Sequence, residues 1–253
     1  MNHRIRHKKT ARLASPADAS GFSGIEVIVL AGGLGTRLQR VVSDRQKVMA
    51  PVRGMPFLEI LLRRLFAENV GRIILCVGYM KDGVMRFVRE AAMRDPRFLR
   101  VEFSEEDEPL GTGGAVKRAS ITIRGDDCVV MNGDTLSDVG IGELYRFHKD
   151  RGYAVSIAVM ERGKSDGGRI NLDNSGRIVD FREKSGTGKF MNAGVYAMNK
   201  KVFSHMPEGP FSLEKDFFPE AVAALPCGAF ITKRFVDIGT PEQYKLANEV
   251  FEL

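Results

Sequence analysis

A short apolar run that stops at a group of glycines constrains this chain more than any other stretch. Residues 25–31 are almost continuously apolar and β-branched, which predicts a strand buried on both faces of a sheet. Residues 32–38 then read Gly-Gly-Leu-Gly-Thr-Arg-Leu. Glycines let backbone N–H groups approach an anion, and the guanidinium of Arg37 can bind two phosphate oxygens at once. We therefore expect a phosphate-binding loop where this strand ends.

Two common nucleotide-binding loops do not fit this stretch. A dinucleotide fingerprint that starts at Gly33 needs glycine at position 38, where Leu38 stands. A Walker A loop needs Ser or Thr after Gly-Lys and a glycine five positions before that pair. Phe190 follows the pair at 188–189, and Ala158 stands at the glycine position of the pair at 163–164. The stretch 30–38 instead resembles the L-A-G-G-x-G-T-R-L signature of the sugar-1-phosphate nucleotidyltransferases.

Most of the net charge lies in the first residues. The chain carries +6, but residues 1–24 hold five basic side chains and one acid, which leaves +2 for the remainder. We expect residues 1–24 to form a flexible basic arm, with contact to nucleic acid or a membrane as the alternative, and the arm contains no apolar segment long enough for a signal peptide or a membrane span. The near-neutral remainder argues against a nucleic-acid-binding protein.

Cysteine and histidine usage excludes two further classes of protein. Cys76, Cys128 and Cys227 lie far apart in the sequence, and the four histidines are scattered. Neither a disulfide framework nor a zinc site follows from this pattern. We expect a reduced, soluble, cytoplasmic protein without a nucleic-acid or membrane partner. The oligomeric state stays open, and a homo-oligomer is compatible with the sequence.

The order of the expected elements indicates an α/β fold. Further buried strands are predicted at 73–77 and 128–131, and a short strand at 101–104. Residues 39–55 are expected to be irregular. Helices are predicted over 81–94, 112–120 and 141–150, and another begins with Pro56 in its first turn. Parallel strands joined by right-handed helical crossovers collect ligands at their carboxyl ends. The glycines that end three strands, Gly32, Gly78 and Gly133, are therefore expected along one edge of the sheet.

The pattern becomes rich in strands beyond Gly152. Strands are predicted at 153–160, 168–172, 178–182 and 191–198, and helices at 216–224 and 241–250. We find no repeat or linker, so we expect one domain over 25–253. Its nucleotide-binding half would be 25–150 and its sugar-phosphate-binding half 151–253.

Asp134 and Asp237 are the candidate metal ligands. Asp134 follows a buried strand and the dipeptide Asn-Gly, which places its carboxylate at the same edge as the glycine loop. Mg²⁺ takes oxygen ligands and commonly binds one or two carboxylates together with substrate phosphates. Taken alone, Asp134 could equally cap a turn. Beside a phosphate loop, the role of metal ligand is favoured.

The family resemblance extends along most of the chain. Four further segments occur in family order and at family-like spacing: Asn132-Gly-Asp134, Phe181-Arg-Glu-Lys184, Asn192-Ala-Gly-Val-Tyr196 and Asp237-Ile-Gly-Thr-Pro241. The resemblance implies a Rossmann-like nucleotidyltransferase fold, with a mixed, mostly parallel sheet flanked by helices, in which Asp134 and Asp237 hold Mg²⁺. It implies nucleotide contacts from Leu30, Ala31, Gly32, Gly33, Gly35 and Thr36, sugar contacts from Gly168, Glu183 and Asn192, and catalytic contacts from Arg37, Lys47, Asp134 and Lys184.

Two departures from the family pattern concern the loops of the site. The family's P-K-P is Gln46-Lys47-Val48 here, and Gly167 replaces the aromatic residue usual before Gly168. Lys47 is present, but the prolines that stiffen its loop in the family pattern are not. The alternative to a catalytic role is therefore that Lys47 is a solvated surface lysine. Either the rigidity of the loop comes from elsewhere, or the clamp on the pyrophosphate side is looser than usual.

The reaction implied by the resemblance is attack of a sugar 1-phosphate oxygen on the α-phosphorus of a nucleoside triphosphate. The nucleophile is already anionic, so the reaction needs no general base. The protein must bring two anions together in line and neutralise the transferring group. Arg37, Lys47 and Mg²⁺ would do so from the nucleotide side, and Lys184 from the sugar side.

An acidic segment bears on the choice of base. Residues 104–115 carry four acids, and a carboxylate can accept hydrogen bonds from N1 and N2 of guanine or from N4 of cytosine, which favours GTP or CTP. The string from Glu108 to Ala115 looks like the base-binding segment of guanylyltransferases, in particular those acting on D-glycero-α-D-manno-heptose 1-phosphate. It implies base contacts from Glu108, Gly111 and Thr112.

Further resemblance to the same guanylyltransferases lies at Val77-Gly-Tyr79 and at Phe211-Ser-Leu-Glu-Lys-Asp216. It implies that the chain uses GTP and makes GDP-heptose and pyrophosphate for a bacterial surface polysaccharide such as capsule. Mannose 1-phosphate as the acceptor, CTP or dTTP as the donor, and a non-catalytic regulatory subunit that binds a nucleotide-sugar remain alternatives.

Overall fold

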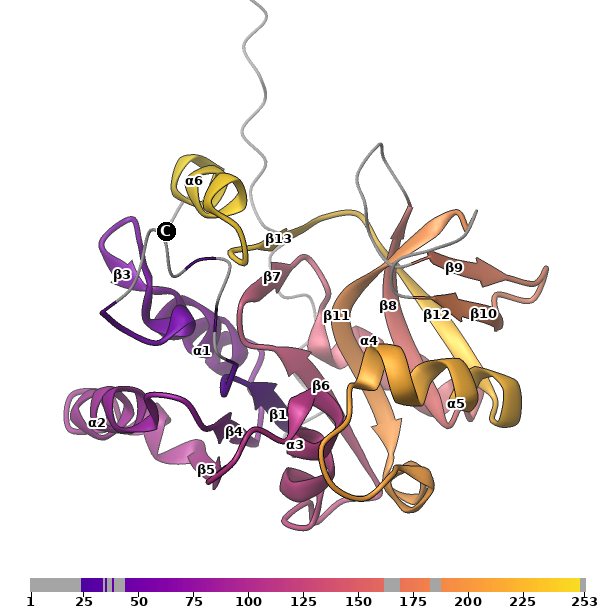
Figure 1. The fold of residues 1–253 in the computed structure, drawn as a ribbon, viewed down its shortest axis with the longest axis horizontal. Helices are drawn as coiled ribbons and strands as arrows, with labels where there is room; N and C mark the ends of the chain where they lie inside the picture. Colours follow the sequence, from indigo (N-terminus) through magenta and orange to yellow (C-terminus); the bar gives the residue numbers. More distant parts are fainter. Residues whose placement is uncertain are drawn as a thin grey trace, which may run out of the picture.

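A nine-stranded mixed sheet forms the central layer of the protein (Figure 1). The structure is a computed structural model that describes residues 24–33, 35, 38, 44–161, 169–182 and 188–250. The strands of this sheet are β1 (Glu26–Leu30), β4 (Arg72–Val77), β5 (Val101–Glu105), β6 (Asp127–Asn132), β8 (Val155–Glu161), β9 (Arg169–Leu172), β10 (Ile178–Arg182), β11 (Phe190–Asn199) and β12 (Cys227–Thr232). Helices flank the sheet, so the predicted α/β fold is confirmed.

The first half of the chain supplies parallel strands, and the second half supplies strands that pair mostly antiparallel. β5, β4, β1 and β6 lie side by side in parallel, with Leu30 of β1 level with Cys76 of β4 and Asn132 of β6. β11 continues the sheet antiparallel to β6 and also pairs with β8 and β9. β12 then pairs in parallel with β8. The second half therefore extends the sheet, as the strand-rich pattern predicts.

The helices are α1 (Phe57–Ala67), α2 (Lys81–Ala92), α3 (Gly111–Ser120), α4 (Ile141–Arg151), α5 (Phe218–Ala224) and α6 (Pro241–Val250). Successive side chains of a strand point to opposite faces, and β1 follows this rule. Val27 and Val29 pack in a core with α1, α2, α4 and α6, whereas Ile28 packs in a second core with α3 and α5. The continuous apolar run of this strand thus reflects burial on both faces.

The structure corrects several expectations about element boundaries. Pro56 is the N-cap of α1 and not a first-turn residue, because the helix begins at Phe57. Part of the segment expected to be irregular contains the 3₁₀ turn η1 (Lys47–Met49) and a hairpin of β2 (Pro51–Val52) and β3 (Met55–Pro56). The helix expected at 216–224 begins as a π-helix, η4 (Leu213–Phe217), and continues as α5.

Besides this hairpin, three further strands were not predicted from the sequence. These are β12 and the antiparallel pair β7 (Thr135–Ser137) and β13 (Phe235–Asp237). β7 and β13 have only three residues each, which is too few for an alternating pattern to be read from the sequence.

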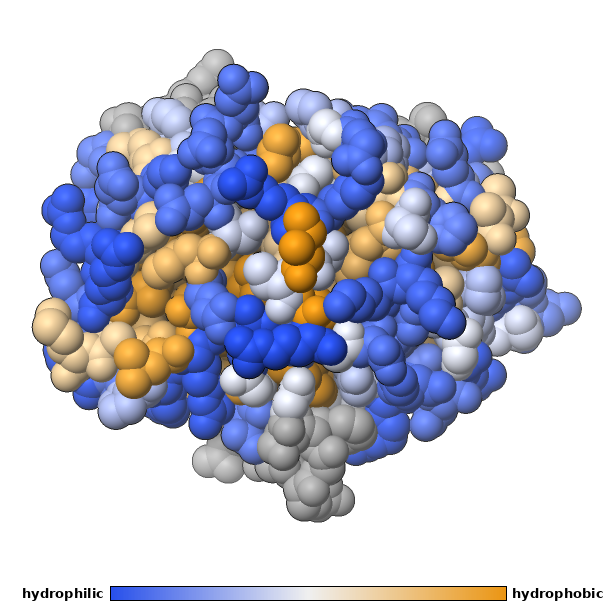
Figure 2. All heavy atoms as spheres, turned by 90° about the horizontal axis from the view of Figure 1, so that it is seen from below, coloured by the Kyte–Doolittle hydropathy of each residue, from blue (hydrophilic) through white to orange (hydrophobic). Residues whose placement is uncertain are grey.

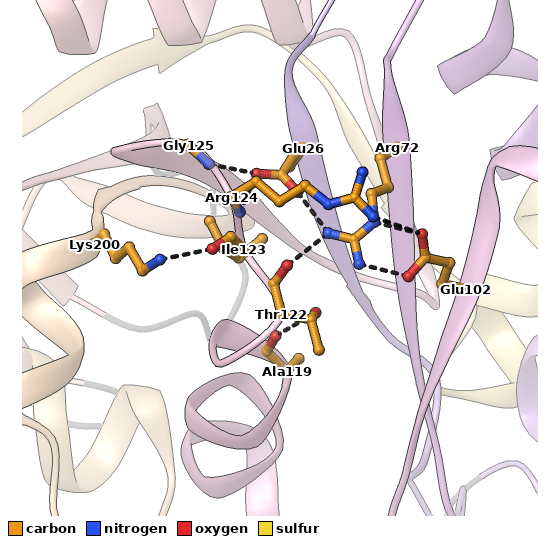
Figure 3. A network of polar contacts seen from close by, with 9 residues as sticks. All are labelled: Glu26, Arg72, Glu102, Ala119, Thr122, Ile123, Arg124, Gly125 and Lys200. Atoms are coloured by element: carbon orange, nitrogen blue, oxygen red, sulfur yellow. Dashed lines mark hydrogen bonds and ion pairs between the residues drawn. The ribbon is translucent and has the colours of Figure 1, made fainter.

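Ion pairs connect the amino-terminal ends of the parallel strands β1, β4 and β5 (Figure 3). Arg72 contacts Glu26 over 2.7 Å and Glu102 over 2.5 Å, and Glu26 accepts N–H groups of Arg124 and Gly125 over 2.8 Å. Burial raises the pKa of Glu26, but hydrogen bonds from Gly125 and Arg72 outweigh it, so the pKa is lowered. These charges pair with one another and hold the sheet edge to the loop after α3.

Surface features give no sign of a membrane span in the described ranges, where no helix is both long and apolar enough to cross a bilayer. Figure 2 shows a mainly hydrophilic face on which apolar residues are interspersed. The three cysteines are buried and free.

Candidate active site

Three strand ends form one glycine-lined edge. Gly133 N–H donates to Leu30 O over 2.8 Å, and Ala31 N–H donates to Cys76 O over 2.9 Å. A Cβ atom on Gly32 would lie 3.2 Å from the backbone nitrogen of Gly78. The carboxyl ends of β1, β4 and β6 therefore meet closely, as predicted, and the close approach needs glycine.

The described part of the glycine-rich loop packs against Lys47 at Gly35. Gly35 has φ of +62°, and a Cβ atom there would lie 3.0 Å from Cβ of Lys47. Gly33 is exposed, and a Cβ atom there would have no neighbour within 4 Å, so this backbone faces open space. The remaining predicted site residues of the loops, Thr36, Arg37, Gly168, Glu183 and Lys184, lie outside the described residues.

The ammonium group of Lys47 lies between the carboxylates of Asp134 and Asp237. Nζ of Lys47 donates a hydrogen bond to Oδ2 of Asp134 and lies 3.7 Å from Oδ1 of Asp237. The Lys47 side chain is only 10% exposed, whereas Asp134 and Asp237 are 29% and 34% exposed. Lys47 is therefore not a solvated surface lysine, and both carboxylates keep access to a ligand.

The short ladder of β7 and β13 brings the two aspartates together, although 102 positions separate them in the sequence. Asp237 pairs with Thr135, and Ile238 N–H donates to Asp134 O over 3.0 Å. Two carboxylates that converge on one cation fit a magnesium ion, which prefers oxygen ligands. In the described part of the chain, no group of three or more His, Cys, Asp or Glu side chains is arranged to hold a metal ion. Substrate phosphate oxygens and water would complete such a coordination shell.

Glu106 lies against the glycine edge. A Cβ atom on Gly32 would be 2.9 Å from Oε1 of Glu106, while Oε2 accepts the N–H of Leu110 over 3.1 Å. Burial raises the pKa of this carboxyl group, and the Leu110 hydrogen bond opposes the rise. Glu106 belongs to the acidic segment singled out in the sequence, but Glu108 was preferred there. In the structure Glu108 is exposed.

Segment 209–217 covers the glycine-rich start of α3. Gly111 has φ of +70°, and a Cβ atom on Gly113 would lie 2.0 Å from the ring of Phe211, so both positions require glycine. The Thr112 hydroxyl donates to Glu214 over 2.8 Å and accepts the N–H of Leu213 over 2.9 Å. The hydroxyl of Thr112 thus holds this segment in place.

Asn192 reaches the same glutamate through Tyr196. Asn192 donates to the Tyr196 hydroxyl over 2.7 Å, and that hydroxyl donates to Glu214 over 3.2 Å. Asn192 also accepts the N–H of Gly194, whose φ of +72° accompanies the irregular register between β11 and β8. Burial and the negative charge of Glu214 raise the pKa of Tyr196 well above its usual value.

Three residues of this region, Glu106, Glu214 and Tyr196, were not predicted as site residues from the sequence. For Glu214 and Tyr196 the signal was present, because both lie in segments quoted for the resemblance. Taken together, the described residues combine an open glycine backbone, one buried cation and two converging carboxylates at a single sheet edge. Such an arrangement can hold phosphate groups and neutralise their charge.

Comparisons with known proteins agree with this chemistry. The model of the family described as nucleotidyl transferase matches residues 26–252. The chain is 31% identical over 224 residues to D-glycero-α-D-manno-heptose 1-phosphate guanylyltransferase of Campylobacter jejuni, which covers 87% of this chain and 97% of that protein. It is 33% identical over 227 residues to mannose-1-phosphate guanylyltransferase of Mycobacterium tuberculosis, where the match covers 87% of this chain and 62% of that protein.

A solved structure supports the same assignment. The crystal structure of HddC from Yersinia pseudotuberculosis complexed with GMP-PN matches with a TM-score of 0.76 and 35% identity, over 90% of this chain and 100% of that chain. With a family match over nearly all described residues and relatives above 30% identity, this chain belongs to the nucleotidyl transferase family.

Proposed function

We propose that the protein transfers GMP from GTP to D-glycero-α-D-manno-heptose 1-phosphate and so forms GDP-heptose and pyrophosphate. One observation carries the proposal: Lys47 lies between Asp134 and Asp237 at the edge where the glycine loop follows β1. This arrangement supports the proposal, because a positive charge and two carboxylates that would bind a metal ion lie together at the edge where two phosphate-bearing substrates would meet. The similarity to heptose 1-phosphate guanylyltransferases supports the choice of substrates.

Each group has a role in this proposal. The backbone from Leu30 to Gly35 binds the triphosphate, and Arg37 and Lys47 neutralise its negative charge. Lys184 binds the phosphate of the sugar. Because the attacking oxygen is already ionised, the protein contributes positioning and electrostatic stabilisation and no proton transfer. The sugar hydroxyl groups would contact Glu183 and Asn192, with the backbone of Gly168 against the ring.

Asp134 and Asp237 would hold Mg²⁺. When bound, this ion supplies positive charge to the phosphate oxygens of the nucleotide. The converging carboxylates support the assignment, and the Lys47 ammonium group provides a second cation beside them.

Glu106 and the start of α3 would contact the base. Guanine presents two N–H donors on its Watson–Crick edge, and a carboxylate is the acceptor that matches them. The position of Oε1 of Glu106 against Gly32 supports Glu106 as this acceptor, and Glu108, which the family resemblance implies, is the alternative. Gly111 would let the backbone approach the base.

The setting follows from these substrates. GDP-heptose would serve a bacterial surface polysaccharide such as capsule, and the reaction would take place in the cytoplasm, which suits three free thiols. Mannose 1-phosphate remains the alternative acceptor, supported by the mannose-1-phosphate guanylyltransferases among the relatives.

A matrix of four nucleoside triphosphates and two sugar 1-phosphates tests the proposal. Pyrophosphate release should be fastest with GTP and the heptose 1-phosphate, and chelation of divalent ions should abolish it. Arg37→Ala should lower turnover on the order of 100-fold or more, by analogy with loss of one preorganised anion donor. Fastest release with mannose 1-phosphate would reassign the acceptor, and no release with any pair would refute the enzymatic function.

A further inference from the structure

We propose that Gln46 is a positioning residue whose side-chain amide, acting together with Val48, fixes Lys47 against the phosphate loop. This inference rests on the proposed function, in which Lys47 neutralises the triphosphate. Gln46 does not touch the substrates itself. Its hydrogen bonds would supply the rigidity that two prolines give to the P-K-P pattern, from which this chain departs at 46 and 48.

The amide of Gln46 joins two separate segments. Gln46 is 3% exposed. Its Nε2 donates to Ala31 O and, over 3.4 Å, to Gly33 O, while its Oε1 accepts the N–H of Val48 over 2.8 Å. A carbonyl oxygen only accepts and a backbone N–H only donates, so these partners fix which end of the amide is which.

This arrangement places Lys47 relative to the loop. Gln46 is the N-cap of η1, and Lys47 is the first residue of that turn. The two carbonyls held by the amide flank Gly32, in the stretch that should bind the triphosphate. Loss of the amide therefore frees the loop and the lysine to move against each other. A shift of about 1 Å in a positioning contact can cost on the order of 100-fold in rate.

Gln46 and Val48 depend on each other. Gln46 has φ of −62°, which proline also adopts, and Val48 lies in the first turn of η1, where proline is tolerated. Proline at 48 would remove the N–H that Oε1 accepts. Proline at 46 would remove that acceptor and leave the N–H of Val48, a residue only 2% exposed, without it. Each single proline breaks a hydrogen bond, whereas both together remove donor and acceptor at once.

The test is a double-mutant cycle of Gln46→Pro, Val48→Pro and the double variant, with Gln46→Ala as a further variant and Gln243→Ala as the control. Gln243 is exposed on α6, far in sequence from the loop. For each we would measure kcat, the KM values for GTP and for the heptose 1-phosphate, GTP affinity by calorimetry, and the melting temperature.

We expect Gln46→Ala to lower kcat/KM for GTP and the affinity for GTP by about 10-fold or more, with KM for the sugar phosphate within about twofold of wild type. Gln46→Pro should be impaired like Gln46→Ala, whereas Val48→Pro should be impaired less because it keeps the contacts of Nε2 with Ala31 and Gly33. The double variant should be no more impaired than Gln46→Pro, because both changes remove the same hydrogen bond between Oε1 and Val48. Selective loss on the nucleotide side, without an added loss in the double variant, distinguishes positioning from a general loss of stability.

Two results would overturn the inference. One is Gln46→Ala with GTP kinetics and affinity equal to those of Gln243→Ala. The other is a double proline variant as impaired as the product of the two single effects. If wild type releases no pyrophosphate from GTP with any sugar phosphate, the proposed function fails, but the affinity cycle with GTP still tests the role of Gln46 separately.

Discussion

The hydroxyl group of Tyr196 donates a hydrogen bond to Glu214 over 3.2 Å and thereby joins the two halves of the proposed active site. Asn192, proposed to bind the sugar, contacts this hydroxyl, and Thr112, proposed to bind the nucleotide, contacts the same glutamate. Tyr196 is fully buried, and η4, which carries Glu214, is a π-helix. Such helices are rare and frequently occur at functional sites.

Removing this hydroxyl should affect both substrates. Tyr196→Phe leaves Asn192 and Glu214 each without one partner, and we expect a loss of about 1–3 kcal/mol in the free energy of unfolding. The KM values for GTP and for the sugar phosphate should rise together, because Asn192 and Thr112 are coupled through Glu214. Steady-state kinetics and urea titration measure both effects. Glu220→Gln, at an exposed site on α5, is the control. A KM change for one substrate alone would contradict the coupling.

Gly32 has no space for a side chain. A Cβ atom there would lie 2.9 Å from Oε1 of Glu106 and 3.2 Å from the nitrogen of Gly78. We expect Gly32→Ala to lower the free energy of unfolding by about 1–3 kcal/mol, because the backbone of Gly78 must shift. It should also reduce the affinity for GTP.

The matched control for this substitution is Gly83→Ala. Gly83 lies inside α2, and a Cβ atom there has no neighbour within 4 Å. Alanine at this helical position should raise the free energy of unfolding by about 1 kcal/mol. Urea titration and calorimetry with GTP compare the two variants. Equal GTP affinity for Gly32→Ala and wild type would argue that the nucleotide does not bind at this edge.

Much of the fold could be predicted from the sequence because the parallel strands are buried on both faces. Their continuous apolar runs stand out from the helical spacing around them, as in Val27–Leu30 of β1. The glycine-lined edge could be predicted from the alternation of strands and helices, because three parallel strands are each followed closely by a glycine. The convergence of Asp134 and Asp237 was implied only by the family resemblance, because the strands that pair them are too short to leave a pattern.

The contacts that support the site could not be predicted from local patterns. From the sequence, glutamine at position 46 suggested a less rigid loop around Lys47. Its hydrogen-bond partners Ala31 and Gly33 lie more than ten positions away, so no local pattern reveals these contacts. Glu106 and Glu108 are indistinguishable by composition, and only the fold decides which one faces Gly32. In each case the deciding information is a distance across the fold between side chain and backbone.

A buried histidine predicts how stability depends on pH. At the sheet edge opposite the site, the imidazole of His148 is hydrogen-bonded on both sides. Its Nδ1 lies 3.0 Å from the hydroxyl of Ser156, and its Nε2 lies 3.2 Å from the carboxylate of Asp127. Hydroxyl, imidazole and carboxylate occur in the order of a hydrolytic triad, but Ser156 is completely buried, so the cluster is structural. Burial lowers the pKa of His148, although the charge of Asp127 opposes this effect.

A base with a lowered folded pKa binds fewer protons in the folded chain than in the unfolded chain. The stabilising contribution is therefore complete above the unfolded pKa of about 6.5 and decreases as the pH falls from there toward the folded pKa. We expect the free energy of unfolding to decrease as the pH is lowered from about 7.5 to below about 6.5. This decrease should be smaller in His148→Gln. Exposed His205→Gln should keep the wild-type slope. Urea titrations across this range would contradict the prediction if all three slopes agree.

The choice of base should depend on Glu106 and not on Glu108. The carboxylate of Glu106 lies against the glycine edge. An amide in its place has only one acceptor oxygen, and its NH₂ group is a donor that would face the N–H groups of guanine. We expect Glu106→Gln to lower kcat/KM for GTP by about 10- to 100-fold, as for the loss of a hydrogen bond to a charged group. The value for other triphosphates should fall less.

Glu108, which is exposed, should tolerate the same substitution with a change of about twofold or less. The comparison requires kcat/KM with GTP, CTP and dTTP for both variants. If Glu108→Gln alone lost the preference for GTP, guanine would be recognised from the exposed loop before α3, as the sequence first indicated.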